Sequence, residues 1–341
     1  MTAVTDLTLT RRLLELAQGY QITQVLAVAA RLEIADRLLD GPKDSKELAA
    51  AAGVHEPSLF RMLRTLACLG LLSSLSERRF ALTPLGACLA GRHENSARAR
   101  VLHHGESLYP HWSDLLGTIQ TGENVYQRRH GTDAWAVRAA RPDGGLGFDD
   151  AMQEGSSQRV RGVIEAYDFS AFRDVVDVAG GRGGLLAGIL AAYPHLHGVL
   201  FDQPQVVADA PAILAAAGVA DRCRVVAGSF FDGVPEGGDA YVLSAIIHDW
   251  DDEPATTILR NCRRAMSRSG RLLLIERVFT MQTDNAVSTC LWDLQMMHAL
   301  SGRERSQEEF RALLARAGFN LTRVVPRPDG AVIEAVPEGW S

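Results

Sequence analysis

The 341-residue sequence lacks paired cysteine motifs, long apolar runs and an excess of positive charge. Its five cysteines include no C-x-x-C pair, which indicates reduced, mostly buried thiols rather than disulfides or a zinc ribbon. No apolar run reaches about 18 residues and no secretion signal opens the chain, so we expect a cytoplasmic protein that does not enter a membrane. The formal net charge of -6 repels phosphate backbones, so nucleic acid is not an expected partner.

The length and the 47% hydrophobic content predict two compact domains, because single cores rarely grow beyond about 250 residues. Residues 10–40 carry apolar positions at helical spacing and end at Gly41-Pro42. A short helix to Ala52 and a helix from 57 to 69 follow, and residues 71–82 alternate as two strands around a charged turn. This order of helices and strands predicts a winged helix.

A winged helix raises the alternative of a DNA-binding regulator that senses a metabolite. The helix in the recognition position offers only Arg61 and Arg64 to a DNA groove, which disfavours this alternative. Apolar residues occupy so much of its circumference that we expect burial on more than one side, with a second subunit as one candidate partner: Leu59, Phe60, Met62, Leu63, Leu66 and Leu69.

Strands and helices alternate in the second half of the chain. Five strands are expected at 175–178, 198–201, 224–226, 241–243 and 272–275, and helices at 185–192, 205–217 and 253–266. This alternation predicts a parallel sheet with helices on both faces. Two further strands, 321–325 and 331–335, are close enough in sequence to form an antiparallel hairpin. The expected fold is therefore α/β, with a doubly wound, mostly parallel, seven-stranded sheet.

A glycine-rich turn, Asp177-Val178-Ala179-Gly180-Gly181-Arg182-Gly183-Gly184, follows the first of these strands and allows close approach to a ligand. An NAD fingerprint would need glycine where Leu186 stands, which disfavours a dehydrogenase. Asp202 ends the second strand, where a carboxylate accepts hydrogen bonds from ribose hydroxyls. Together these residues predict an adenosine ligand; the alternative is that Asp202 caps the helix after Pro204.

Four segments are shared, in order and spacing, with a known family: VVDVAGGRGGL, GVLFDQPQVV, GSFFDGVPEGGDAYVLSAIIHDWDDE and SGRERSQEEFRALLARAGF. They resemble the plant caffeic-acid-type and bacterial natural-product O-methyltransferases, which are class I S-adenosylmethionine-dependent enzymes. The resemblance implies S-adenosylmethionine as cofactor, a hydroxylated aromatic or polyketide-like small molecule as substrate, and a homodimer. It also implies a winged-helix dimerisation domain at 1–96 and a catalytic domain at 97–341, in which residues 97–167 form a helical bridge that lines the substrate pocket.

The resemblance assigns the cofactor site residue by residue. The glycine-rich turn would wrap the methionine part, Asp202 would hold the ribose, and Ser229 and Phe230 would flank the adenine. The family usually has glycine where Ala179 stands and aspartate where Ser229 stands, and many plant relatives have lysine at Ser244. The complete cofactor-binding set is Asp177, Ala179, Gly180, Gly181, Gly183, Asp202, Gln203, Ser229, Phe230 and Ser244.

His248 directly follows the fourth strand, at the edge of the sheet where open α/β folds bind ligands. An imidazole can take the proton of a phenol as its oxygen attacks a methyl group. The resemblance makes His248 the catalytic base, flanked by Glu276 and Glu304. Each glutamate could instead pair with an arginine, either Arg277 or Arg305. No carboxylate cluster at metal spacing is present, so no metal is expected.

Two further expectations concern the neighbours of the base. Asp249 is expected to cap the following helix. The resemblance places the helix that contains LWDLQMM against the acceptor, although its apolar spacing also suits a core helix. The candidate substrate-binding residues are Trp135, Met152, Trp292, Met296 and Met297. A relative that keeps the cofactor but hydroxylates or decarboxylates a polyketide is the alternative function.

Overall fold

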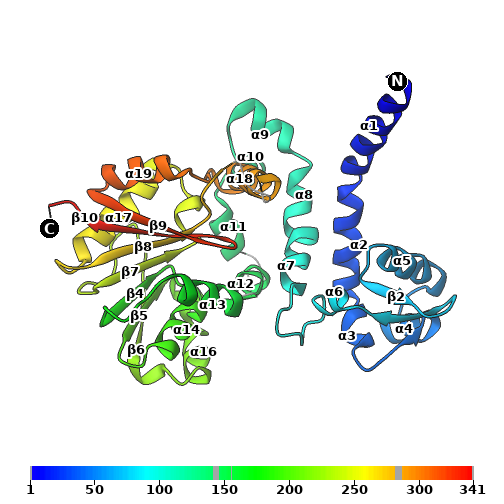
Figure 1. The fold of residues 1–341 in the computed structure, drawn as a ribbon, viewed down its shortest axis with the longest axis horizontal. Coiled ribbons are helices and arrows are strands. Elements are labelled where there is room, and N and C mark those ends of the chain that lie inside the picture. Colours follow the sequence, from blue (N-terminus) through cyan, green and yellow to red (C-terminus); the bar gives the residue numbers. More distant parts are fainter. Residues whose placement is uncertain (1, 141–145, 155, 281–285, 340–341) are drawn as a thin grey trace. The chain divides into compact units, whose positions relative to one another are not determined.

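The computed structural model describes residues 2–140, 146–154, 156–280 and 286–339. The chain separates into two compact units (Figure 1). Unit 1 contains Met1–Ser113 and Asp150–Gly155, and unit 2 contains Asp114–Asp149 and Ser156–Ser341. The domain boundary expected after residue 96 therefore falls inside unit 1.

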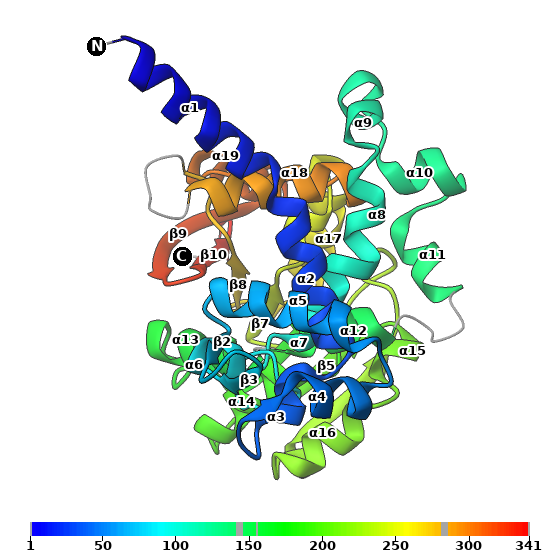
Figure 2. The same ribbon diagram turned by 90° about the vertical axis from the view of Figure 1, so that its right-hand side faces the viewer.

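Unit 1 contains the winged helix. Its three-stranded antiparallel sheet has the order β1-β3-β2, with Leu72 opposite Leu82. Figures 1 and 2 show the wing strands beside the helices that precede them. The expected helix–helix–wing order is confirmed. The elements are α1 (Thr2–Ala17), α2 (Gly19–Arg31), α3 (Ile34–Leu38), β1 (Lys43–Asp44), α4 (Ser45–Ala52), α5 (Glu56–Cys68), β2 (Leu72–Ser74), β3 (Arg79–Leu82), α6 (Pro84–Ala87), α7 (Arg98–Leu102), the π-helix η1 (His103–Leu108) and α8 (Tyr109–Trp112).

Local chemistry fixes where α4 begins and how α5 packs. The Asp44 carboxylate accepts hydrogen bonds from the N–H groups of Lys46 and Glu47, at 2.8 and 2.9 Å, and the Glu47 carboxylate accepts from the Asp44 N–H at 2.7 Å. This capping box satisfies N–H groups that the first turn leaves unpaired. On α5, an apolar face of Leu59, Leu63 and Leu66 is buried in the core of unit 1.

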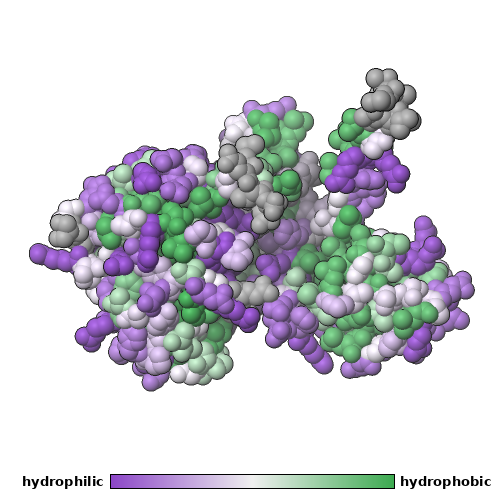
Figure 3. Space-filling view, viewed as in Figure 1, coloured by the Kyte–Doolittle hydropathy of each residue, from purple (hydrophilic) through white to green (hydrophobic). Residues whose placement is uncertain are grey.

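Apolar residues also remain at the surface of unit 1 (Figure 3). On α1 and α2 the exposed ones are Leu9, Leu13, Leu14, Leu16, Tyr20, Ile22 and Val28. A row of large apolar side chains at the surface is typical of a protein–protein contact. Within the described part of the chain, no helix is both long enough and apolar enough to span a membrane.

Unit 2 contains the seven-stranded sheet, in the order β6-β5-β4-β7-β8-β10-β9. The first five of these strands pair in parallel, and β10 pairs antiparallel with both β8 and β9, so the expected topology is confirmed. The strands are β4 (Asp174–Val178), β5 (His197–Asp202), β6 (Cys223–Ala227), β7 (Ala240–Ser244), β8 (Arg271–Glu276), β9 (Phe319–Arg327) and β10 (Gly330–Pro337).

Helices cover both faces of this sheet. One apolar core joins its strands to α17 and α19, and a second joins them to α13, α14 and α16. Burial on both sides explains why β7 and β8 are nearly continuous apolar runs.

The helices that follow α8 along the chain include some that do not pack on the sheet. They are α9 (Leu115–Thr121), α10 (Val125–His130), α11 (Ala134–Ala139), α12 (Leu146–Gln153, which the division between the units crosses), α13 (Ser156–Ala166), α14 (Gly184–Ala192), α15 (Pro204–Val207), α16 (Ala210–Ala216), α17 (Asp252–Ala265), α18 (Ala286–Leu300) and α19 (Gln307–Arg316).

One expected helix is divided. The segment 205–217 forms two helices, α15 and α16, rather than one. Pro211 lies in the first turn of α16, where its missing N–H costs nothing, whereas inside a continuous helix it would remove a hydrogen bond. The single-helix prediction was therefore wrong at this proline.

Candidate active site

The expected cofactor and catalytic residues meet at the carboxyl ends of the parallel strands. Parallel pairing aligns these ends, with Val178 opposite Phe201 and Ser244 opposite Ile275. The glycine-rich turn follows β4, Asp202 ends β5, Ser229 follows β6, Ser244 ends β7 and Glu276 ends β8. Because β4 lies between β5 and β7, the chain turns to opposite sides of β4 at this point, where open α/β sheets bind ligands.

Asp202 is bonded to the glycine-rich turn. The Gly181 N–H donates to Asp202 Oδ2 at 2.8 Å, and the Gln203 N–H donates to Asp202 Oδ1 at 2.6 Å. The N-cap of α15 is Gln203, and Asp202 accepts no N–H from within that helix among the described residues. The helix-capping alternative for Asp202 is therefore wrong, and its carboxylate connects the ends of β4 and β5.

The backbone of the turn is held in an uncommon conformation. Ala179 has φ 56° and Gly181 has φ 62°, both in the left-handed region that glycine favours. For alanine this conformation costs about 1 kcal/mol. A Cβ on Gly180 would lie 2.5 Å from Asp177 Oδ2, so the chain has no room for a side chain there. Alanine at position 179, where the family usually has glycine, therefore adds local strain, but the turn keeps the expected shape.

Two buried polar groups at this edge suit a ligand with a cationic and a polar part. Burial, together with the charge of Asp202, raises the pKa of Asp177 to about 7. A neighbouring ammonium group would offset this cost. The Ser244 hydroxyl is also buried, and it has no hydrogen-bond partner among the described residues. These groups fit an amino acid-bearing nucleoside such as S-adenosylmethionine.

An aromatic group follows β6, where the resemblance places the adenine. The Phe230 ring lies 5.9 Å from the Trp250 ring, and Phe231 lies 4.8 Å from the same ring. Asn261 Nδ2 donates to the carbonyl oxygens of Phe230 and Phe231, at 2.6 and 3.0 Å. Ser229 Oγ accepts from the Phe231 N–H at 3.2 Å. The sequence interpretation missed Asn261, which holds this segment from α17.

The structure brings His248, Glu276 and Glu304 together. His248 lies in a short 3-10 turn, Ile247–Asp249, and is 6% exposed. Its Nδ1 lies 2.9 Å from Glu304 Oε1 and 3.5 Å from Glu276 Oε2. An ionised carboxylate only accepts hydrogen bonds, so Nδ1 carries the proton and Nε2 faces the other way. This is the orientation that a general base needs.

Each glutamate is itself held in place. Glu276 Oε1 accepts from the N–H groups of Ile246 and Ile247, at 3.1 and 2.7 Å, which joins the end of β8 to the turn after β7. The Glu304 N–H donates to Asp293 Oδ1 of α18 at 2.8 Å. Gly302 lies so close that a Cβ would be 2.1 Å from the His248 carbonyl oxygen. The imidazole is therefore fixed from three separate segments.

Arg305 bonds to the turn that contains His248, a role that the sequence interpretation missed. It is 1% exposed and donates to the carbonyl oxygens of Ile247 and Trp250, at 3.0 and 2.9 Å, and to Asp252 Oδ1 at 2.8 Å. Its ionic partner is thus Asp252 and not either glutamate. Arg277, the other arginine considered, lies over the Trp292 ring at 5.3 Å.

Asp249 does not cap a helix, contrary to expectation. The N-cap of α17 is Asp251, whose Oδ1 accepts the Asp252 N–H at 2.8 Å. Asp249 is instead 8% exposed, and its Oδ1 lies 3.5 Å from His248 Nε2. Both aspartates suit an N-cap, and only Asp251 has the extended backbone that the position requires.

Burial and charge act in opposite directions on this cluster. Burial would lower the pKa of His248, but the charges of Glu276, Asp249 and Glu304 and the hydrogen bond to Glu304 raise it to about 10. Burial raises the pKa of Glu276 to about 7 despite the charge of His248. The cluster therefore shares protons among buried groups, which is typical of a site that moves protons.

Four of the five candidate acceptor residues lie in unit 2. Trp135 is on α11, and Trp292, Met296 and Met297 are on α18. Met296 is buried, whereas the other three side chains are half-buried. Met152 belongs to unit 1. The core interpretation of α18 fits Met296, and the half-buried side chains remain candidates for the acceptor.

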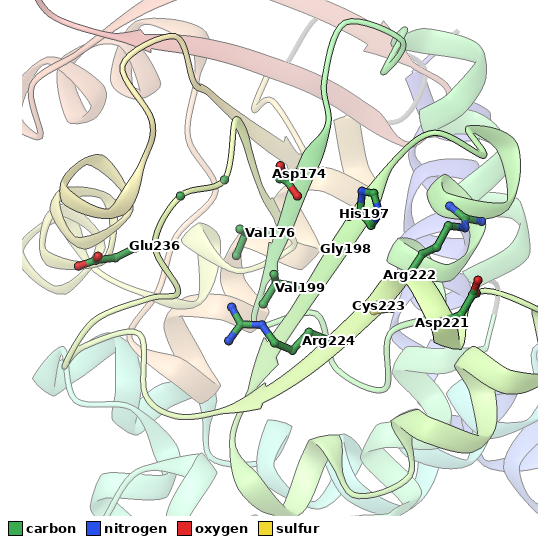
Figure 4. A pocket seen from close by; sticks show the side chains of 12 residues that line it. Asp174, Val176, His197, Gly198, Val199, Asp221, Arg222, Cys223, Arg224 and Glu236 are labelled. Atoms are coloured by element: carbon green, nitrogen blue, oxygen red, sulfur yellow. The ribbon is translucent and has the colours of Figure 1, made fainter.

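A hollow lies at the opposite, amino edge of the same sheet. It has a volume of about 450 Å³ and is bordered by the first residues of β4, β5 and β6 (Figure 4). Asp174, His197 and Arg224 are exposed there, and Arg222 donates to the carbonyl oxygens of Leu190 and Leu196. Water can solvate these charges, so the hollow has no group poised for chemistry.

The sequence of this chain is similar to those of known proteins. An O-methyltransferase domain matches residues 112–320, and an O-methyltransferase dimerisation domain matches residues 14–92. The chain is 43% identical over 326 residues to the phenazine O-methyltransferase PhzM of Lysobacter antibioticus, covering 95% of both chains. It is 32% identical over 323 residues to the phenazine-1-carboxylate N-methyltransferase of Pseudomonas aeruginosa, covering 95% of this chain and 96% of that one.

Solved structures give the same result. An O-methyltransferase from neocarzinostatin biosynthesis, in complex with S-adenosylmethionine and 2-hydroxy-5-methyl naphthoic acid, matches with a TM-score of 0.80 and 34% identity, covering 93% of this chain and 96% of that one. Fold, site and relatives therefore agree: the chain belongs to the O-methyltransferase family, and its cofactor is S-adenosylmethionine.

Proposed function

We propose that this enzyme methylates a phenol or enol hydroxyl of an aromatic or polyketide-like natural product, with His248 as general base and without a metal ion. The hydrogen bond from His248 Nδ1 to Glu304 at 2.9 Å carries the proposal, because it leaves Nε2 to accept the hydroxyl proton. Relatives that act on phenazines, and a neighbour that holds a naphthoic acid, support an aromatic acceptor.

The cofactor site is the carboxyl edge described above. Asp177, the turn from Ala179 to Gly183, Asp202, Gln203, Ser229, Phe230 and Ser244 would hold S-adenosylmethionine. When bound, this cofactor supplies an electrophilic methyl group on a sulfonium whose positive charge also lowers the pKa of a nearby imidazolium. Among the described residues, no group of His, Cys, Asp or Glu side chains is arranged to hold a metal ion.

The raised pKa of His248 suits this role. The neighbouring carboxylates that raise the pKa of His248 make its imidazole a stronger base, which favours transfer of the phenol proton to it. Glu276 and Glu304 then stabilise the imidazolium that forms. The cost is that the neutral imidazole is scarce at every pH below the raised pKa of His248, so turnover should rise with pH.

The match to a dimerisation domain and the exposed apolar side chains of α1 and α2 support a homodimer. The absence of a nucleic-acid partner and a cytoplasmic location remain predictions from the sequence. The placement of the domain boundary at 96 also remains a prediction. The acceptor residues Trp135, Trp292, Met296 and Met297 of unit 2 are part of the proposal, and Met152 of unit 1 remains a prediction from the sequence.

The test compares His248→Ala with the wild-type enzyme, using labelled S-adenosylmethionine and a panel of phenols. We expect turnover to fall by roughly 10² or more, with calorimetric affinity for S-adenosylhomocysteine unchanged. Unchanged turnover would contradict the base assignment, and inhibition by EDTA would contradict metal independence. Hydroxylated, decarboxylated or N-methylated products, identified by mass spectrometry, would assign the reaction to the corresponding alternative.

A further inference from the structure

Helix α18 contains a buried hydrogen-bond donor that the proposed reaction does not use. Trp292 is half-buried as a whole, but its indole nitrogen, Nε1, is buried and has no hydrogen-bond partner among the described residues. An indole N–H is a donor only, and a buried one usually has an acceptor, because an unpaired donor in the interior costs free energy. This N–H is therefore available to an acceptor oxygen of a ligand.

Hydrogen bonds connect the segment around Trp292 to the His248 site. Helix α18 contacts the 3-10 turn Ile247–Asp249, which contains His248. Asp293, the residue after Trp292, accepts the Glu304 N–H at 2.8 Å, and Glu304 Oε1 in turn lies 2.9 Å from His248 Nδ1. The indole is therefore attached to the backbone next to a residue that helps to hold the proposed base.

Arg277 approaches the same ring from the end of strand β8. It directly follows Glu276, whose Oε2 lies 3.5 Å from His248 Nδ1. The Arg277 guanidinium carbon lies 5.3 Å from the centre of the Trp292 ring, a cation–π contact that restricts how the ring can turn. The segments that carry Glu276 and Glu304 thus both reach the indole, and the direction of its N–H is restricted.

The groups that surround His248 bind hydrogen-bond donors rather than acceptors. Glu276, Glu304 and Asp249 are buried and acidic, and Nε2 of the neutral His248 also accepts. These groups can bind hydroxyls of the methyl acceptor, but they would repel an anion and do not donate to a carbonyl oxygen. The Trp292 N–H has the opposite character, since it is uncharged and only donates. A carbonyl oxygen, which is uncharged and only accepts, is the group that complements it.

We propose that the Trp292 N–H donates a hydrogen bond to a carbonyl oxygen of the aromatic substrate, and so selects hydroxylated ketones and quinones over phenols that lack a carbonyl. This inference rests on the proposed function and names the substrate class for the same site. The competing explanation is packing, in which the ring only fills space beneath Arg277 and its N–H takes no part in recognition.

The test measures binding, so it does not depend on the base assignment. Calorimetry on protein saturated with S-adenosylhomocysteine compares hydroxylated ketones with phenols that lack only the carbonyl: 6- and 7-hydroxy-1-tetralone with 5,6,7,8-tetrahydro-2-naphthol, and 2-hydroxy-9-fluorenone with 2-hydroxyfluorene. We expect at least one ketone to bind about 10-fold more tightly than its partner. Trp292→Phe keeps an aromatic ring without the N–H and should abolish this preference.

Two controls isolate the hydrogen bond. A carbonyl also makes a phenol more acidic, and comparing the same pair in the wild type and in Trp292→Phe removes this effect. Val287→Ala, at an exposed position of α18, is the matched variant and should leave the preference unchanged. If Trp292→Phe does not bind S-adenosylhomocysteine, the comparison is repeated with 3-benzothienylalanine at position 292, which has the shape of tryptophan and no N–H.

Equal affinity for both members of every pair in the wild type, or no binding of any ketone, would overturn the proposal. A preference that persists without the N–H, or equal loss for ketone and partner, would assign Trp292 the packing role instead. The two proposals fail separately: a ketone preference that depends on Trp292, beside normal turnover in His248→Ala, would overturn only the base assignment. Turnover that needs His248 without any ketone preference would overturn only the role of Trp292.

Discussion

The two edges of the central sheet contain similar residue types in different surroundings. At the amino edge, Asp174, His197 and Arg224 surround a hollow but remain exposed. At the carboxyl edge, Asp177 and His248 are buried, and each has a pKa far from its ordinary value. Water screens charges at the first edge and is excluded at the second. Desolvation of interacting charges, rather than the presence of a hollow, therefore distinguishes the active edge.

The largest expected effect concerns Asp177 in the cofactor-free protein. Its pKa is about 7 in the folded chain, above its ordinary value of 3.8, so ionisation destabilises the fold progressively from about pH 4 to about pH 7. Asp177→Asn removes this cost. We expect the stability of the variant relative to wild type to rise by roughly 4 kcal/mol across this range, measured by urea unfolding at several pH values. Parallel pH curves for the two proteins would show that burial of Asp177 is not costly.

A glycine at each edge allows a matched steric comparison. A Cβ on Gly302 would lie 2.1 Å from the His248 carbonyl oxygen, and one on Gly238 at the amino edge would lie 2.5 Å from Val176. Gly302→Ala should lower kcat by about 10², because it displaces the proposed base, His248, whereas Gly238→Ala should lower only the thermal midpoint. Equal kcat in the folded fractions of both variants would mean that the position of His248 is not critical.

Glu304→Gln tests the effect of a negative charge beside the proposed base, His248. The amide keeps an acceptor oxygen near Nδ1, but it removes one of the charges that raise the pKa of His248. A lower pKa makes neutral imidazole available at lower pH, so the acid limb of the kcat profile should move to lower pH. The maximum should fall about 10-fold, since the imidazolium is less stabilised. An unmoved acid limb would contradict the coupling between Glu304 and His248.

The smallest effect is expected at the amino edge. Arg224→Gln and His197→Ala change exposed residues that border the hollow in Figure 4. We expect kcat and KM to stay within about twofold of wild type, because solvated charges contribute little. A tenfold change in either constant would give this hollow a role and break the comparison between the edges.

The sheet could be predicted from the sequence because its strands carry a local signal. Runs such as Ala240–Ser244 and Arg271–Glu276 have continuous apolar centres, and both lie between two helical layers. The proline that divides α15 from α16 is also a local signal, and it was overlooked. The meeting of His248 with Glu276 and Glu304 followed from the family resemblance, since no spacing along the chain shows that these segments are close.

The sequence interpretation failed for contacts between distant segments and for a choice between two neighbouring aspartates. Arg305 bonds to carbonyl oxygens more than 50 positions earlier in the chain, and Asn261 holds the segment after β6 from α17. Neither contact has a sequence motif. Asp249 and Asp251 both suit a helix N-cap, so the choice between them depended on backbone conformation that only the structure supplies.

Ala179 has a further consequence for the energetics of cofactor uptake. Its left-handed backbone and the bond from the Gly181 N–H to Asp202 are both formed in the chain alone. Alanine populates this conformation less readily than the glycine usual in the family, so the bond to Asp202 holds the turn against a strain of about 1 kcal/mol. Because the turn has this shape before a ligand binds, a smaller entropic penalty opposes association than for a turn that becomes ordered on binding.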